Sequence, residues 1–87
     1  MEPAPNFPVT IHILNAMKVE GTIRFIDLSG GFWGIESDDG RKFAPIDDIP
    51  SSFQKDGLRV KTTLKPSQVF SIMMWGEPVE VKSIQSL

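Results

Sequence analysis

A strict alternation of apolar and polar residues from Leu58 to Lys65 is the feature that most limits the fold of this chain. A period of two is the repeat of a β-strand that buries one face and leaves the other in water. One face would carry Leu58, Val60, Thr62 and Leu64, and the other would carry Arg59, Lys61, Thr63 and Lys65. The segment therefore predicts a strand in a sheet with one solvated face.

Other segments are also typical of strands, and turn signals separate them. The predicted strands are 19–27, 32–37, 41–46 and 79–84, with 9–14 as an accessory strand. Ser29-Gly30-Gly31 predicts a turn, and Asp38-Asp39-Gly40 between two β-prone runs is a strong hairpin signal. Gly21 inside the first long strand predicts a bulge or a sharp bend, which helps a sheet to curl.

The only helix-like segment is 47–56. Asp47 or Asp48 can cap it, Pro50 suits its first turn, and Gly57 can close it. Phe53 is the expected buried anchor of this short helix.

The order of these elements is three strands, a short helix and two strands. This order predicts an all-β fold, a five-stranded OB-type barrel with a short helix between strands 3 and 4, spanning residues 9–87 after a flexible N-terminal tail at residues 1–8. OB-type barrels bind oligonucleotides and oligosaccharides. An SH3-like barrel is the alternative fold, and the acidic, helix-prone insert argues against it.

Length and composition fit one small binding domain. The chain has 87 residues, no cysteine and a formal net charge of −2. Disulfides and thiolate metal sites are excluded, and a cytoplasmic location is favoured. The apolar stretches are too short to span a bilayer and residues 1–8 do not read as a signal peptide, so no membrane insertion is expected. The oligomeric state and any longer parent protein stay open.

The first half of the barrel resembles a cold-shock domain. The resemblance rests on the strand 21–27, the Gly31-Phe32-Trp33-Gly34-Ile35 run and the Asp38-Asp39-Gly40 hairpin. It implies that bases stack on aromatic side chains of strands 2 and 3. The sequence is also similar to a small OB-type domain family of unknown function, which implies no activity.

Several positions depart from the cold-shock pattern. Gly34 stands where the resemblance implies a second stacking phenylalanine, and Gly30 replaces a lysine. The run from Phe43 to Ile46 also differs from the family's third strand. These differences leave the fold expectation unchanged and count against the base-stacking function that the resemblance implies.

The sequence therefore predicts a non-catalytic binding module, with single-stranded DNA or RNA as the expected partner. The predicted nucleic-acid-binding residues are three aromatic residues and three cations: Phe25, Phe32, Phe43, Arg24, Arg59 and Lys61. Phe32 and Trp33 are adjacent and must point to opposite faces of a strand. Trp33 and Ile35 are two residues apart and share one face of the strand, so the pattern predicts that Trp33 is buried and Phe32 is exposed.

A protein partner or a homodimer is the alternative function. Five large apolar residues stand within 70–75, more than one face of a strand can bury. The predicted protein interface consists of Phe70, Met73, Met74 and Trp75. Methionines and exposed apolar patches suit adaptable contacts with other proteins.

No catalytic or metal site and no cofactor is predicted. His12 is the only histidine and has no set of partner ligands. The acidic pairs Asp38-Asp39 and Asp47-Asp48 fit ordinary roles as turn formers and helix caps. We therefore expect no enzyme activity.

Overall fold

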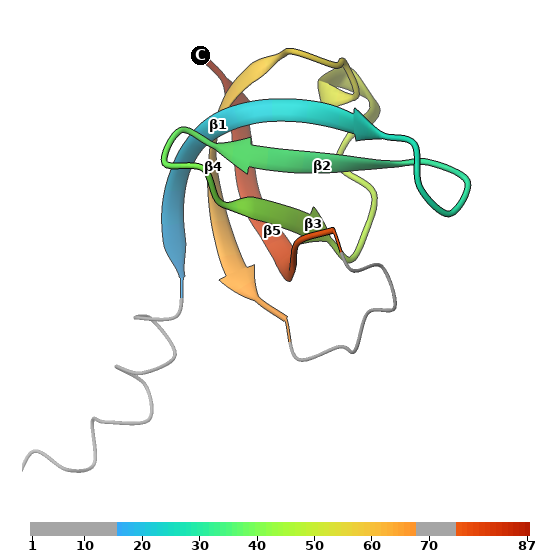
Figure 1. Cartoon of the computed structure of the whole chain (residues 1–87). Coiled ribbons are helices and arrows are strands. Elements are labelled where there is room, and N and C mark those ends of the chain that lie inside the picture. Colours follow the sequence, from blue (N-terminus) through green and yellow to red (C-terminus); the bar gives the residue numbers. More distant parts are fainter. Residues whose placement is uncertain (1–15, 68–74) are drawn as a thin grey trace, which may run out of the picture.

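The computed structural model describes residues 16–67 and 75–87 and shows a closed barrel (Figure 1). Its strands are β1 Met17–Ile26, β2 Phe32–Ser37, β3 Lys42–Pro45, β4 Arg59–Pro66 and β5 Glu77–Ser86. Around the barrel their order is β1-β2-β3-β5-β4. The β3–β5 pair is parallel and the other pairs are antiparallel. The all-β prediction and its five barrel strands are confirmed, and the architecture is compatible with an OB-type barrel. The predicted tail 1–8 and accessory strand 9–14 lie outside the described residues.

Strand β1 contributes to two sides of the barrel. Its first half pairs with β4, its second half pairs with β2, and Gly21 belongs to both ladders. A Cβ atom at Gly21 would lie 2.9 Å from the Cα of Ser37, inside the backbone of β2. The glycine therefore permits the close approach of β1 to β2. Strand β1 as a whole is strongly curved (Figure 1). Neither ladder shifts register at Gly21; the register shift lies between β4 and β5, at Thr63/Leu64.

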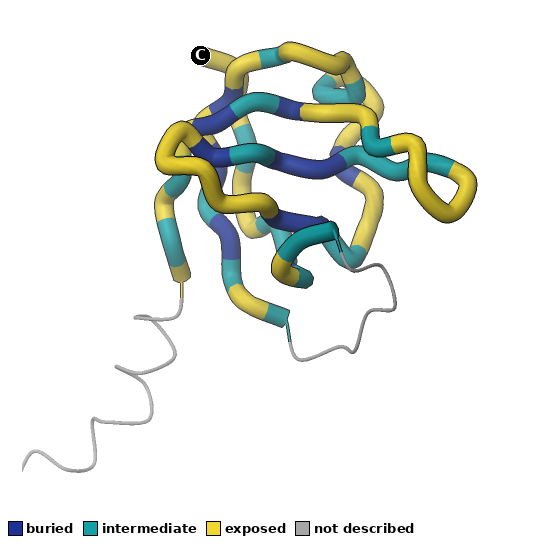
Figure 2. The backbone as a smooth tube through the Cα atoms, in the orientation of Figure 1, coloured by how far each residue is buried: buried dark blue, intermediate teal, exposed yellow. Residues whose placement is uncertain are grey.

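Apolar residues from every strand form the core, and buried positions are spread over several strands (Figure 2). The buried core cluster consists of Ile23, Ile35, Phe43, Ile49, Val60, Leu64 and Val79. The alternation in β4 is confirmed, because Val60, Thr62 and Leu64 are buried while Arg59 and Lys61 are exposed. The buried Thr62 hydroxyl donates a 2.6 Å hydrogen bond to the Ser83 carbonyl, so its polar group is satisfied.

The helix predicted at 47–56 is wrong. The segment forms a single 3-10 turn, Ser51–Phe53, which follows Pro50 and has no side-chain cap. The Gln54 side-chain amide donates to the Ile49 carbonyl at 2.9 Å. Ile49, and not Phe53, is the fully buried anchor of this connection. A proline, two serines and an early glycine leave too few residues for an α-helix to repay its nucleation cost.

Both turns predicted around β2 are present. Gly40 lies in the turn of the β2–β3 hairpin and has φ 92°. In the β1–β2 turn, Ser29, Gly30 and Gly31 have φ 50°, 89° and 96°. These left-handed conformations explain the glycines in both turns. No helix within the described ranges, 16–67 and 75–87, is long and apolar enough to cross a membrane.

Candidate ligand-binding face

Strand β2 carries an aromatic ring on each of its two faces. Phe32 and Trp33 are neighbours, so they point to opposite sides of the sheet. Trp33 meets Phe25 with 5.1 Å between ring centroids, and Phe32 meets Trp75 at 5.8 Å. The predicted contrast between a buried Trp33 and an exposed Phe32 is not seen, because both residues are half-buried.

The ring of Trp75 occupies the space above Gly34. A Cβ atom at Gly34 would lie 2.5 Å from Cζ3 and 2.6 Å from Cη2 of that indole. Gly34 is the position where the cold-shock resemblance implies a stacking phenylalanine. An aromatic ring is therefore present over this position, supplied by the segment that leads into β5.

Two cations border these rings. The Lys42 ammonium lies 5.7 Å from the centroid of the Trp75 ring, within the range of a cation–π contact. Arg24 lies opposite Gly34 in the β1–β2 register, and its Nε is 3.4 Å from Glu36 Oε1. We call Phe32, Gly34, Lys42 and Trp75 the aromatic face.

Phe25 lies away from the aromatic face. It shares its side of the sheet with Trp33, and 48% of its surface is exposed. Its backbone N–H donates to Asp56 Oδ1 at 2.8 Å, which continues the hydrogen bonding of β1 where β4 has not yet begun. The predicted site residues Phe25 and Phe32 are thus on opposite sides of one hairpin.

Phe43 is not part of the aromatic face. Its side chain is fully buried in the core, where Ile23 and Ile35 are also buried. A base stacks on a ring with an accessible face, and the ring of Phe43, one of the predicted nucleic-acid-binding residues, has almost no exposed surface. The inward parity of β3 at this position is the physical reason.

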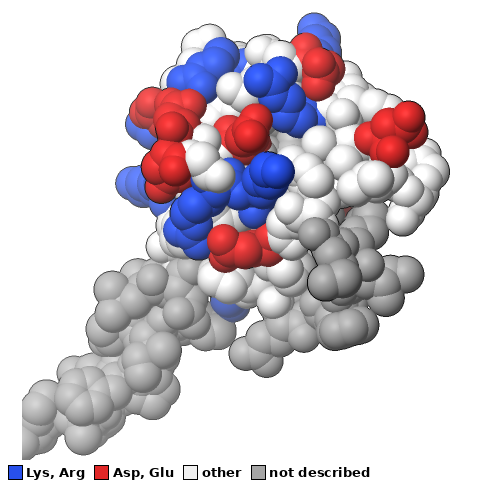
Figure 3. Space-filling view, viewed as in Figure 1, with Lys and Arg blue, Asp and Glu red and all other residues white. Residues whose placement is uncertain are grey.

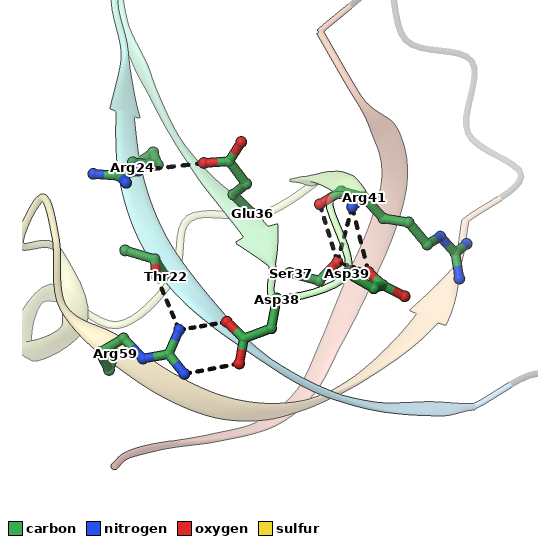
Figure 4. A network of polar contacts seen from close by, with 8 residues as sticks. All are labelled: Thr22, Arg24, Glu36, Ser37, Asp38, Asp39, Arg41 and Arg59. Carbon is green, nitrogen blue, oxygen red and sulfur yellow. Dashed lines mark hydrogen bonds and ion pairs between the residues drawn. The ribbon is translucent and has the colours of Figure 1, made fainter.

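The arginines of the described residues form ion pairs, and Figure 4 shows those of Arg24 with Glu36 and of Arg59 with Asp38. Arg59 binds Asp38 with Nη2 2.8 Å from Oδ2, and its Nη1 also donates to Thr22 Oγ1 at 3.2 Å. This hydrogen bond from Arg59 lowers the pKa of Asp38 below its ordinary value. Arg41 binds Glu77 at 2.9 Å. The predicted phosphate contacts Arg24 and Arg59 are thus each held by a carboxylate of this chain.

The Arg59–Asp38 pair also joins the two oppositely charged parts of the sequence. Asp38 belongs to the acidic segment 36–48, and Arg59 to the basic segment 55–65. Figure 3 shows charges of both signs close together over the same face of the barrel. On this face the basic segment therefore does not form a surface of positive charge alone.

Asp39 organises the β2–β3 turn. Its carboxylate accepts hydrogen bonds from the Ser37 hydroxyl and from the Arg41 backbone N–H. The Ser37 hydrogen bond, followed by the Arg41 one, lowers the pKa of Asp39. These contacts are those of a turn former. In the part of the chain that the structure describes, no group of three or more histidine, cysteine or acidic residues could hold a metal ion.

Sequence reasoning assigned Trp75 to a protein interface and overlooked Lys42. The structure places both beside Phe32, while Phe70, Met73 and Met74 lie outside the described residues. Lys61 lies on the outer surface of β4, two strands away from β2. The alternation of β3 could have predicted that Lys42 points outward. The contact of Trp75 with Gly34 joins residues far apart in the sequence, so no local pattern predicts it.

Comparisons with models of known protein families, with curated proteins and with solved structures found no match.

Proposed function

We propose that this protein is an OB-type module that binds single-stranded nucleic acid through the aromatic face. The observation that carries the proposal is the placement of the half-buried Phe32 and Trp75 rings beside the Lys42 ammonium. OB-type barrels use the face of strands 2 and 3, flanked by the loops between strands 1 and 2 and strands 4 and 5. Phe32 and Lys42 come from those strands, and Trp75 precedes β5.

Stacking, more than charge, would supply the affinity. Aromatic side chains stack on any base, whereas the arginines near this face already have carboxylate partners. Lys42 is the cation placed to meet a phosphate, and the net charge of −2 gives no general attraction. If binding neutralises about one or two phosphates, a plot of the logarithm of the binding constant against the logarithm of the salt concentration should have a slope of only about −1.

Fluorescence of Trp75 tests the proposal directly. In a Trp33→Phe background Trp75 is the only tryptophan, so a stacked base would quench its emission. Titration with a short dT oligomer and a mixed RNA oligomer at low salt should give saturable quenching. Emission that stays constant at high oligomer excess would contradict the proposal.

A protein-interaction or homodimer role is the alternative that the sequence leaves open. Trp75 is the described member of the predicted interface, and its ring packs on Phe32 and Gly34 of its own barrel. Light scattering after size exclusion, on wild type and Trp75→Ala, separates the two functions. A dimer that Trp75→Ala dissociates would favour the interaction role.

A further inference from the structure

A polar groove lies on the outer surface of β1, β4 and β5, on strands other than those of the aromatic face. Its volume is about 260 Å³. It is lined by Lys18, Lys61, Thr62, Thr63, Ser83, Ile84 and Gln85. No carboxylate is among these lining residues. The lining of the groove therefore offers cations and neutral polar groups, and Glu20, which lies opposite Lys61 in the β1–β4 register, is outside that lining.

Strand register brings the two lysines together. Lys18 lies opposite Thr63, and Lys61 is two residues before Thr63 on the same face of β4. Diagonal neighbours of this kind have Cβ atoms about 7–8 Å apart, within reach of long side chains. On the other side of β4, Ser83 lies opposite Thr63 and Gln85 lies opposite Lys61. Two ammonium groups, two hydroxyls and an amide thus share one small surface.

The ammonium groups of Lys18 and Lys61 are not neutralised by ion pairs within the described part of the barrel. Arg24, Arg41 and Arg59 each have a carboxylate partner, whereas Lys18 and Lys61 form no ion pair with any described residue. Glu20 lies opposite Lys61 in register and does not line the groove. Two positive charges therefore face a groove with hydrogen-bonding groups beside them.

We propose that this groove binds a phosphate monoester carried on a sugar. A monoester has a charge of about −1.5 to −2 at neutral pH, which two lysines match, whereas a phosphodiester has one negative charge. Lysine ammonium groups are common phosphate ligands. Thr63, Ser83 and Gln85 can exchange hydrogen bonds with sugar hydroxyls. The proposal does not depend on the aromatic face, because none of the residues that line the groove belongs to that face.

Small phosphorylated probes test the groove. Labelled protein is titrated with ribose 5-phosphate at low salt, and amide shifts are followed at Lys18, Lys61, Thr63 and Ser83. We expect saturable shifts there, weaker binding of inorganic phosphate and none of ribose. Lys18→Gln and Lys61→Gln should each weaken binding about tenfold, the loss of one charged hydrogen bond. Glu20→Gln should strengthen binding, because it removes the nearest carboxylate on β1.

Lys55→Gln is the matched control, since Lys55 is an exposed lysine outside the groove. An equal loss of affinity in Lys55→Gln and Lys61→Gln would overturn the site, as would an absence of saturable shifts. Equal affinity for ribose 5-phosphate and inorganic phosphate would overturn the sugar assignment.

A free sugar phosphate and the 5′-phosphate of an oligonucleotide share this chemistry. Oligomers with and without a 5′-phosphate separate them. The terminal phosphate of a nucleic acid is the source if two results are obtained together. The oligomer with a 5′-phosphate shifts the groove residues while the oligomer without it does not, and the phosphorylated oligomer binds more tightly than ribose 5-phosphate. If ribose 5-phosphate binds as tightly, the free sugar phosphate is the source.

Discussion

The indole ring of Trp75 meets the phenyl ring of Phe32 edge to face, with 5.8 Å between their centroids and 76° between their planes. Phe32 begins β2, whereas Trp75 precedes β5, so the contact joins distant parts of the chain. Aromatic pairs in this geometry add to the energy of simple burial. The contact also unites two residues that the sequence assigned to different functions, one to nucleic-acid binding and one to a protein interface.

Removing either ring should weaken binding of single-stranded oligonucleotides. Phe32→Ala and Trp75→Ala should each cost about 1–3 kcal/mol of binding free energy, the value of one stacked base. Fluorescence anisotropy with a labelled dT oligomer measures this loss. Leu87→Ala is the control, because Leu87 is 59% exposed and lies at the C-terminus. Unchanged affinity in both ring variants would contradict oligonucleotide binding at the aromatic face.

Adding one methyl group at Gly34 should displace Trp75 while the barrel stays folded. The Cβ atom of Gly34→Ala would contact the far end of a side chain that can move. In the Trp33→Phe background, Trp75 emission should shift to longer wavelength, and oligonucleotide affinity should fall about as much as in Trp75→Ala. An unshifted emission spectrum would show that the ring does not rest on Gly34.

The same change at Gly21 should act on stability instead. A Cβ atom there meets the backbone of β2, which cannot move without disturbing the sheet. Gly21→Ala should therefore lower the free energy of unfolding by about 1–3 kcal/mol, the usual cost of overpacking. Denaturant unfolding followed by circular dichroism compares Gly21→Ala with Gly34→Ala. Equal stability of the two variants would contradict the close approach of β1 and β2.

Lys42 and Arg59 should differ in their effect on the salt dependence of binding. Lys42→Gln should reduce the slope of log K against log salt by about 0.7, as expected for one lost phosphate contact with a single strand. Arg59→Gln should leave the slope unchanged, because Asp38 already holds the guanidinium. Anisotropy titrations at several salt concentrations measure both slopes. A larger effect of Arg59→Gln would instead support Arg59 as the nucleic-acid contact predicted from the sequence.

Acid should destabilise the barrel through Asp38 and Asp39. Hydrogen bonds from Arg59 and Ser37 lower the pKa values of these carboxyl groups in the folded state below the ordinary 3.8. A lowered folded-state pKa gives stability that is present above the unfolded value and is lost as pH falls through the folded value. Unfolding should therefore become easier below about pH 4. Asp38→Asn should show a shallower decline, and an identical pH profile would contradict this origin.

The strands could be predicted from the sequence because their signals are local. Alternation from Leu58 to Lys65 and the turn at Asp38–Gly40 each reflect contacts between near neighbours or the geometry of one strand. The helix at 47–56 failed because capping residues were present without enough helix-forming residues between Pro50 and Gly57. Propensity at the ends of a segment does not fix its interior.

The site was harder to predict because it depends on pairing between strands. The alternation of residues in β3 does not by itself show which face is buried. Phe43 is assigned to the core only when its pairing with the buried Ile35 is known. The ion pair of Arg59 with Asp38 and the position of Trp75 over Gly34 arise only when the barrel closes. Residue types alone therefore overstated the free positive charge and misplaced one aromatic ring.

An NMR titration of the labelled protein with a short dT oligomer at low salt tests the central claim most directly. The account predicts saturable shifts at the Phe32, Gly34 and Lys42 amides and at the Trp75 indole, with little change at Phe43. A spectrum that stays unchanged at high oligomer excess, or shifts confined to other surfaces, would contradict the proposal that the aromatic face binds single-stranded nucleic acid.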